Sequence, residues 1–125
     1  MTDRKKTILY VDDDPDYLDT VRTILEANGY EMVEARTAEE GIHHFKETRP
    51  DLVIVDLMME EVDSGTSLVK ELKLAGADVP IYMLSSVGDN LHLTTDFTAL
   101  GLDGIFQKPI DPDTLLTVLE VKLKG

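Results

Sequence analysis

Three carboxylates, one hydroxyl and one ammonium group stand at or just beyond the ends of apolar runs in this 125-residue sequence. Asp12 and Asp13 follow the first run, Asp56 ends the third, and Ser85 and Lys108 follow the last two. Carboxylates within a few ångström of one another cannot all stay ionised without a proton or a cation. All-oxygen ligands favour Mg²⁺, with Mn²⁺ as an alternative ion. A hydroxyl and an ammonium nearby can donate to phosphoryl oxygens, and one carboxylate could be a nucleophile that forms an acyl phosphate.

The elements that must position these groups are five short apolar segments, predicted to be strands at 8–11, 32–35, 52–56, 81–84 and 104–106. Stretches with helical spacing alternate with them, and the fourth, around 90–100, is the weakest because it contains three Thr residues. This alternation predicts a parallel sheet covered on both faces. The carboxyl ends of parallel strands meet at one edge, where such sheets bind ligands. We therefore expect all five groups to converge there.

Helix starts are marked by capping residues. Asp14 precedes Pro15, a favoured first helical residue, so we interpret Asp14 as an N-cap rather than a third metal ligand. Thr37 and Glu40 have the spacing of a capping box, and Asp111 is the candidate N-cap of the last helix. The run of three acids from residue 12 thus divides into two site residues and a cap.

The motifs VDDD, VIVDLMM, MLSS and FQKP resemble, in order and spacing, those of the receiver domains of two-component response regulators, including the single-domain chemotaxis regulator. The resemblance covers essentially the whole chain and implies a single receiver domain over residues 1–125. The implied fold is α/β, a doubly wound five-stranded parallel sheet of flavodoxin-like topology with strand order 2-1-3-4-5 and five helices. The implied function is that of a phosphoacceptor signalling domain, which catalyses only its own phosphorylation and dephosphorylation and is not otherwise an enzyme.

The resemblance also implies a role for each acid. Asp56 would accept phosphate from a sensor histidine kinase or a histidine phosphotransfer protein, and would share in binding Mg²⁺. Asp13 would bind the ion directly and Asp12 through water. The main-chain carbonyl of Met58 would complete the protein ligands.

Two further groups and one surface follow from the same resemblance. The hydroxyl of Ser85 would move toward the phosphoryl group, and Lys108 would pair with that phosphoryl group. The resemblance also implies a cis Lys108–Pro109 bond. Phosphorylation would then change the face formed by the fourth helix, fifth strand and fifth helix, which would bind a downstream protein or output domain.

The sequence departs from the family at several positions. A Pro is usual four residues after the acceptor, where this chain has Glu60, followed by Glu61. An aromatic residue is usual three before the lysine, where this chain has Ile105. Its neighbour Phe106 cannot substitute, because adjacent strand residues point to opposite faces.

Two more departures concern hydrolysis of the phosphate. The residues that flank the site in this family's hydrolysis control are both apolar here, Met58 and Val87. Neither side chain can orient a water molecule, so we expect slow self-dephosphorylation.

Charge and composition restrict the partners. The 12 basic and 25 acidic residues give a net charge of −13, which opposes direct binding of nucleic acid. There is no Cys, no apolar run long enough to span a membrane and no signal-peptide pattern, so we expect a cytoplasmic protein. The sequence reaches Gly125 without an output domain, which leaves a stand-alone regulator and the receiver part of a longer protein as alternatives.

Three rival interpretations remain. A Mg²⁺-dependent phosphohydrolase with a D-x-D loop would use Asp12, not Asp56, as nucleophile, but such enzymes are usually longer and carry a cap. A flavin-binding domain of the same topology needs a polar loop after the first strand, where DDDPD would repel the flavin phosphate. A degenerate receiver acting only as an interaction module is disfavoured by the intact set of five groups.

Overall fold

The computed structural model describes residues 5–56, 64–86 and 101–123. Its strands are β1 (Thr7–Val11), β2 (Glu31–Ala35), β3 (Leu52–Asp56), β4 (Ile81–Ser86) and β5 (Gly104–Lys108). The described helices are α1 (Pro15–Ala27), α2 (Ala38–Thr48), α3 (Ser64–Leu74) and α5 (Pro112–Leu123). The expected fourth helix, and the expectations for Met58, Glu60, Glu61 and Val87, lie outside the described residues.

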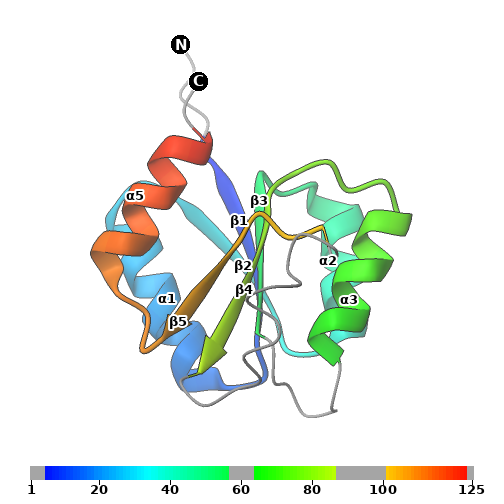
Figure 1. Ribbon diagram of the computed structural model, residues 1–125. Helices are drawn as coiled ribbons and strands as arrows, with labels where there is room; N and C mark the ends of the chain where they lie inside the picture. The colour runs from blue at the N-terminus through cyan, green and yellow to red at the C-terminus, as the bar shows by residue number, and fades with distance from the viewer. Residues whose placement is uncertain (1–4, 57–63, 87–100, 124–125) are drawn as a thin grey trace.

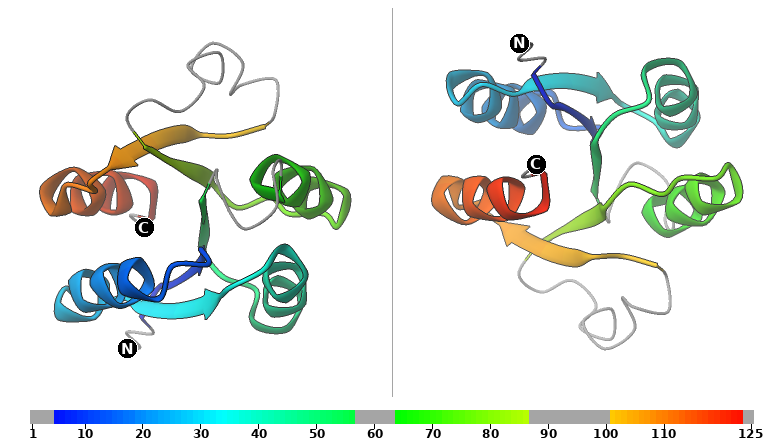
Figure 2. Two further views of the ribbon diagram at one scale, coloured as in Figure 1. Left: turned by 90° about the horizontal axis from the view of Figure 1, so that it is seen from below. Right: turned by 90° about the horizontal axis from the view of Figure 1, so that it is seen from above.

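The strands form one parallel sheet in the order β2-β1-β3-β4-β5, as predicted. Helices α1 and α5 cover one face of the sheet, and α2 and α3 cover the other (Figure 1, Figure 2). None of the helices among these described residues has the length and apolar character that crossing a membrane requires.

The side chains of each strand alternate between two cores, because successive strand residues point to opposite faces. On β1, Ile8 and Tyr10 join the core under α1 and α5, whereas Leu9 and Val11 join the core under α2 and α3. The central strand β3 is buried along its whole length, as its unbroken apolar run predicts. Direct pairing of β3 with β1 within this buried core places the carboxyl ends of the two strands side by side.

Local sequence accounts for the helix boundaries. The Asp14 carboxylate accepts from the Asp16 N–H at 2.9 Å, which confirms it as the N-cap of α1. The Thr37 hydroxyl accepts from Glu40 N at 3.0 Å and caps α2, while Glu40 accepts from the N–H of Arg36, one residue before the cap, at 2.9 Å. Asp111 accepts from Thr114 N at 3.2 Å and caps α5.

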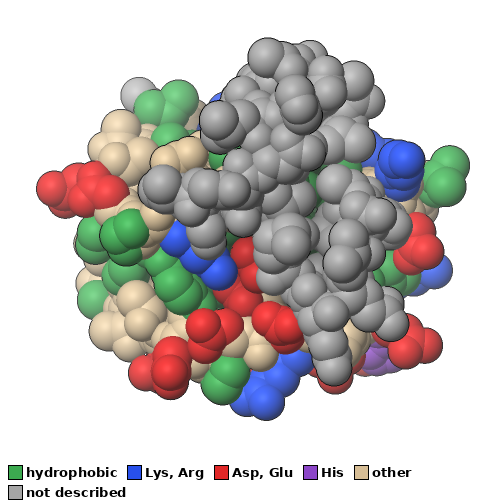
Figure 3. Space-filling model, turned by 60° about the horizontal axis from the view of Figure 1, so that its bottom comes forward, with side chains coloured by type: hydrophobic (Ala, Val, Ile, Leu, Met, Phe, Trp, Pro, Cys, Tyr) green, Lys and Arg blue, Asp and Glu red, His purple; other side chains and the backbone are tan. Residues whose placement is uncertain are grey.

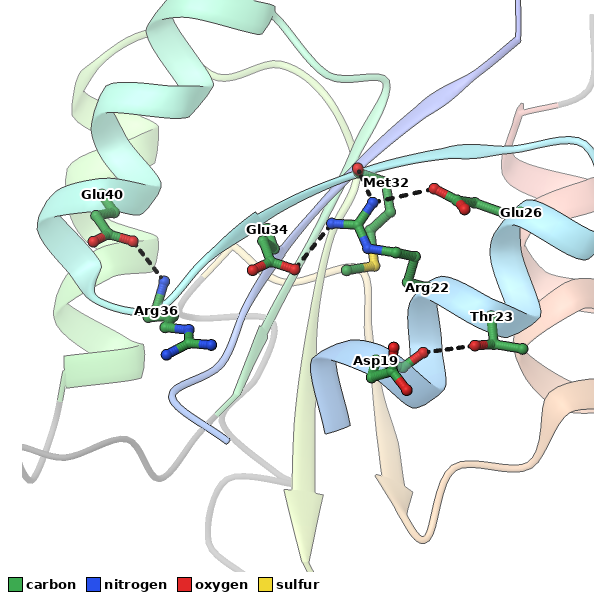
Figure 4. A network of polar contacts seen from close by, with 8 residues as sticks. All are labelled: Asp19, Arg22, Thr23, Glu26, Met32, Glu34, Arg36 and Glu40. Carbon is green, nitrogen blue, oxygen red and sulfur yellow. Dashed lines mark hydrogen bonds and ion pairs between the residues drawn. The ribbon is translucent and has the colours of Figure 1, made fainter. Parts of the chain in front are cut away.

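The edge strand β2 is tied to α1 by Arg22 (Figure 4). Its guanidinium donates to Glu34 at 2.9 Å, to Glu26 at 3.1 Å and to the main-chain carbonyl of Met32 at 3.2 Å. Part of the open sheet edge is therefore occupied by a charged side chain, one way in which proteins disfavour strand addition.

The last two strands are longer than the sequence pattern predicts. β4 and β5 pair through Ser85 with Gln107 and Ser86 with Lys108, two residues beyond their apolar runs. Main-chain pairing continues past the point where the side chains become polar. Ser85 and Lys108 consequently belong to the strands instead of following them, which fixes their backbones at the carboxyl edge.

Candidate functional site

The acidic residues converge at the carboxyl edge of the sheet. Asp12, Asp13 and Asp56 each place a carboxylate oxygen within 4.8 Å of the others, although 44 positions separate the first from the last. Strands β1 and β3 pair directly, so their ends are neighbours. Asp12 and Asp56 are buried, and Asp13 is partly exposed. Figure 3, which looks toward this edge, shows acidic side chains gathered there. The triad is therefore able to hold a metal ion.

Asp12 is the most constrained of the three acids. Its side chain is fully buried, and its two oxygens already accept hydrogen bonds. Oδ2 accepts from the hydroxyl of Tyr10, and Oδ1 accepts from the main-chain N–H of Asp14 at 2.9 Å. Burial, followed by the charge of Asp12, raises the pKa of Tyr10, so the phenol keeps its proton and remains the donor.

Lys108 comes from the end of β5 and supplies the positive charge of the site. Its ammonium lies 3.3 Å from Oδ1 of Asp56 and 3.7 Å from Oδ2 of Asp12, with 18% of the side chain exposed. Burial disfavours the charged form, but the carboxylates of Asp12 and Asp56 outweigh it and raise the pKa of Lys108. The lysine therefore stays charged.

Asp56 is buried beside Asp12 and close to the ammonium of Lys108. Burial and then repulsion from Asp12 raise its pKa to about 7, against a partial lowering by Lys108. One ammonium does not neutralise three neighbouring carboxylates. The site therefore has the donor chemistry, all carboxylate oxygen, and the excess negative charge that a hard divalent cation would satisfy.

Ser85 lies at the same edge. Asp56 pairs with Leu84 on the adjacent strand β4, so Ser85 is one residue further toward the carboxyl end. It is partly exposed. All five groups predicted to meet at one edge are thus carried by strand ends there, whereas Met58 lies outside the described residues.

Ile105 stands three residues before Lys108, where receiver domains usually have an aromatic residue, and its side chain and that of Phe106 lie as the sequence predicts. Ile105 packs against the core on the α2 and α3 side, and Phe106 lies in the core on the α1 and α5 side. There Phe106 stacks on Tyr82 with ring centroids 5.0 Å apart. The two neighbours do point to opposite faces, and Phe106 has a packing role of its own.

Two tyrosines at the site were not identified from the sequence. Tyr10 donates to Asp12, and Tyr17 places its ring 4.5 Å from the ammonium of Lys108. Tyr10 had a weak signal, because it carries a hydroxyl within the buried part of its strand and stands two residues before Asp12. Tyr17 had none, because its partner is remote in the sequence.

Comparison with known proteins agrees with this geometry. Residues 8–120 match the family described as "Response regulator receiver domain". The chain belongs to this receiver family. The Lys108–Pro109 bond is cis, as the resemblance implies.

Curated relatives of the receiver are considerably longer. This chain is 38% identical over 111 residues to a "Probable transcriptional regulator ycf27" of Cyanophora paradoxa, and the match covers 89% of this chain and 45% of that protein. It is 32% identical over 127 residues to "Transcriptional regulatory protein GlrR" of Escherichia coli K12, covering 99% of this chain and 28% of that protein. The receiver thus spans less than half of the length of either relative.

Solved structures match over nearly the whole receiver. A CheY-like receiver domain protein from Methanospirillum hungatei has a TM-score of 0.85 at 31% identity, with 96% of this chain and 94% of that chain covered. Vibrio cholerae chemotaxis protein CheY4 has a TM-score of 0.85 at 28% identity, with 95% and 99% covered. The family and the fold together establish a two-component phosphoacceptor signalling module.

Proposed function

We propose that Asp56 is the phosphoacceptor of this receiver and that residues 1–125 act as one unit around it. The observation that carries the proposal is the position of Asp56: it is a buried carboxylate in contact with an ammonium, beside two further acids. A carboxylate oxygen of Asp56 would attack the phosphorus of a phosphohistidine in a sensor kinase or phosphotransfer protein. The P–O bond forms as the P–N bond breaks, and the imidazole leaves.

The neighbouring acids would hold the divalent cation. Asp13 is the partly exposed member of the triad and is suited to direct coordination, whereas the oxygens of Asp12 already accept from Tyr10 and Asp14 and are suited to contact through water. Asp56 and the carbonyl of Met58 would complete the protein ligands. Mg²⁺, or Mn²⁺ in its place, would neutralise negative charge on the carboxylates and on the incoming phosphoryl oxygens.

Lys108 and Ser85 would recognise the transferred group. The ammonium of Lys108 is already 3.3 Å from Asp56 and would move its hydrogen bond to a phosphoryl oxygen. Ser85, at the end of the adjacent strand, would donate its hydroxyl to another. These two contacts would favour the phosphorylated arrangement of β4 and β5, and so transmit the modification to the face formed by the fourth helix, β5 and α5.

The partner on that face would be a downstream protein or an output domain. The relatives named as transcriptional regulators extend far beyond the matched segment, which supports an output of this kind. The net charge of −13 disfavours direct contact of the receiver with nucleic acid. A cytoplasmic location is consistent with a kinase as phosphodonor.

A phosphohydrolase that uses Asp12 as its nucleophile is disfavoured by the same geometry. Asp12 has no exposed surface, and both of its oxygens are engaged as acceptors. A nucleophile needs a lone pair directed at the substrate, and Asp56 is better placed because its Oδ1 lies 3.3 Å from the ammonium of Lys108, a group suited to bind a phosphoryl oxygen.

Labelling with acetyl phosphate tests the proposal. The wild-type protein should gain one phosphoryl group in Mg²⁺, as measured by intact mass, and none in excess EDTA. Asp56→Asn should gain none under either condition. Asp78→Asn, which changes an exposed acid in the loop before β4, is the charge-matched control and should behave like wild type. Labelling of Asp56→Asn at the wild-type rate would contradict the proposal.

A further inference from the structure

Tyr17, in the first turn of α1, contacts both the side chain and the following backbone of Lys108. The ammonium lies 4.5 Å from the centroid of the Tyr17 ring. The Tyr17 hydroxyl accepts from the main-chain N–H of Ile110 at 3.1 Å, a bond between residues 93 positions apart. We propose that Tyr17 is a positioning residue that holds Lys108 toward the phosphoacceptor. This inference rests on the proposed function of Asp56.

Lys108 needs such support because a lysine side chain is flexible. Its ammonium is a point charge on a four-carbon stem and has no preferred direction of its own. The carboxylates of Asp56 and Asp12, which lie 3.3 and 3.7 Å from the ammonium, attract it toward the acidic residues. The electron-rich face of Tyr17 lies well within the roughly 6 Å at which an aromatic ring attracts a cation. The ammonium is thus held from the acidic side and from the aromatic side together.

The hydroxyl of Tyr17 fixes the backbone that leaves β5. Pro109 has no N–H, so the N–H of Ile110 is the first main-chain donor after Lys108. Tyr17 accepts from that donor, and Ile110 is buried in the same core as Leu18 and Leu115. Tyr17 therefore restrains the ammonium of Lys108 and also the main chain at Ile110, two residues after Lys108.

The position of Tyr17 is in turn tied to the acidic triad. Its helix begins at the Asp14 cap, and the N–H of Asp14 donates to Asp12 at 2.9 Å. The six residues from Asp12 to Tyr17 therefore carry Asp12, Asp13 and the ring that contacts the lysine. Tyr17 thus connects the β1 and β5 sides of the site.

Two substitutions separate the ring from the hydroxyl. Tyr17→Phe keeps the aromatic face and removes the acceptor for Ile110, whereas Tyr17→Leu removes both. The readout is the rate constant of phosphorylation by phosphoramidate at saturating Mg²⁺, a small donor that needs no kinase surface. We expect Tyr17→Leu to slow the reaction by roughly 3- to 30-fold, the range for loss of one cation–π contact, and Tyr17→Phe to slow it by less. Tyr30→Leu, beyond the far end of α1, should stay within about twofold of wild type and serves as the control.

A double-mutant cycle with Lys108→Ala distinguishes positioning from general structure. If Tyr17 acts through Lys108, Tyr17→Leu should change the rate by less than about twofold once the lysine is gone. The Mg²⁺ dissociation constant, measured by titration, should stay near the wild-type value in Tyr17→Leu. Equal slowing with and without Lys108, a parallel loss of Mg²⁺ affinity, or no slowing by either Tyr17 variant would overturn the inference. A wild-type protein that phosphoramidate does not label would instead overturn the proposed function.

Discussion

Replacing Asp56 by Asn should stabilise the cation-free protein, although it removes the proposed phosphoacceptor. Asp56 is 3% exposed and its carboxylate lies beside Asp12, and these surroundings raise its pKa from 3.8 to about 7. The folded protein therefore keeps the proton over a pH range in which the unfolded chain has released it. Asn has nearly the same shape and no charge, so it avoids the cost of ionising at this position.

The sign and size of the effect follow from that pKa. Because the folded-state pKa is the higher one, Asp56 causes no loss of stability below pH 3.8, an increasing loss as the pH rises toward 7, and a constant loss above it. The full loss is on the order of 4 kcal/mol, and between pH 5 and pH 8 it grows by roughly 2–3 kcal/mol. The stability advantage of Asp56→Asn over wild type should grow by that amount across the same range.

Urea denaturation in EDTA at pH 5, 6, 7 and 8 measures this difference. Asp78→Asn is the matched control, since it makes the same change in net charge at an exposed position and should give a difference that does not vary with pH. Saturating Mg²⁺ should narrow the gap at pH 8, because a cation that binds only the folded wild type stabilises it. Parallel pH profiles for wild type and Asp56→Asn, or a less stable Asp56→Asn at every pH, would refute the reasoning.

Four further outcomes are expected. Tyr10→Phe leaves buried Asp12 without its phenol donor and should lower the free energy of unfolding by about 1.5–3 kcal/mol, measured by urea melts in EDTA. A loss no larger than that of Tyr82→Phe would contradict this prediction. Asp13→Ala should abolish the rise in melting temperature that Mg²⁺ produces in wild type; a retained rise would exclude Asp13 as a ligand. Arg22→Ala should lower the free energy of unfolding by about 0.5–1.5 kcal/mol in urea melts, because it removes the contacts of Arg22 to β2. Arg36→Ala, the control in the same view (Figure 4), should lower it by less, and equal losses would argue against the edge contact. Met58→Asn should speed loss of phosphate from the labelled protein, because an amide can orient water, and an unchanged phosphate lifetime would count against slow hydrolysis by apolar flanking residues.

Patterns local in the sequence predicted much of the fold. The five apolar runs predicted the five strands, and their alternation with helical stretches predicted a parallel sheet. The cap of α1 by Asp14 followed from the Pro beside it. These features depend on burial or hydrogen bonding within a few residues, so a short stretch of sequence is sufficient to reveal them.

The site was predictable where topology alone decides position. Strands of a parallel sheet end at the same edge, so acids and a lysine at strand ends must meet there. The two tyrosines of the site were not predicted. Their apolar rings are typical of core residues, and the hydrogen-bond partners of their hydroxyls cannot be read from the sequence. Tyr17 contacts Lys108 and Ile110 only because α1 packs beside the end of β5, a tertiary relation with no local signal.

Identification of the modified residue tests the central claim most directly. An acyl phosphate is reduced by borohydride, which marks the former carboxylate permanently. After labelling with acetyl phosphate in Mg²⁺ and reduction, peptide sequencing by mass spectrometry should find the mark at Asp56 and at no other acid. A mark at Asp12, or at another residue in place of Asp56, would contradict the account.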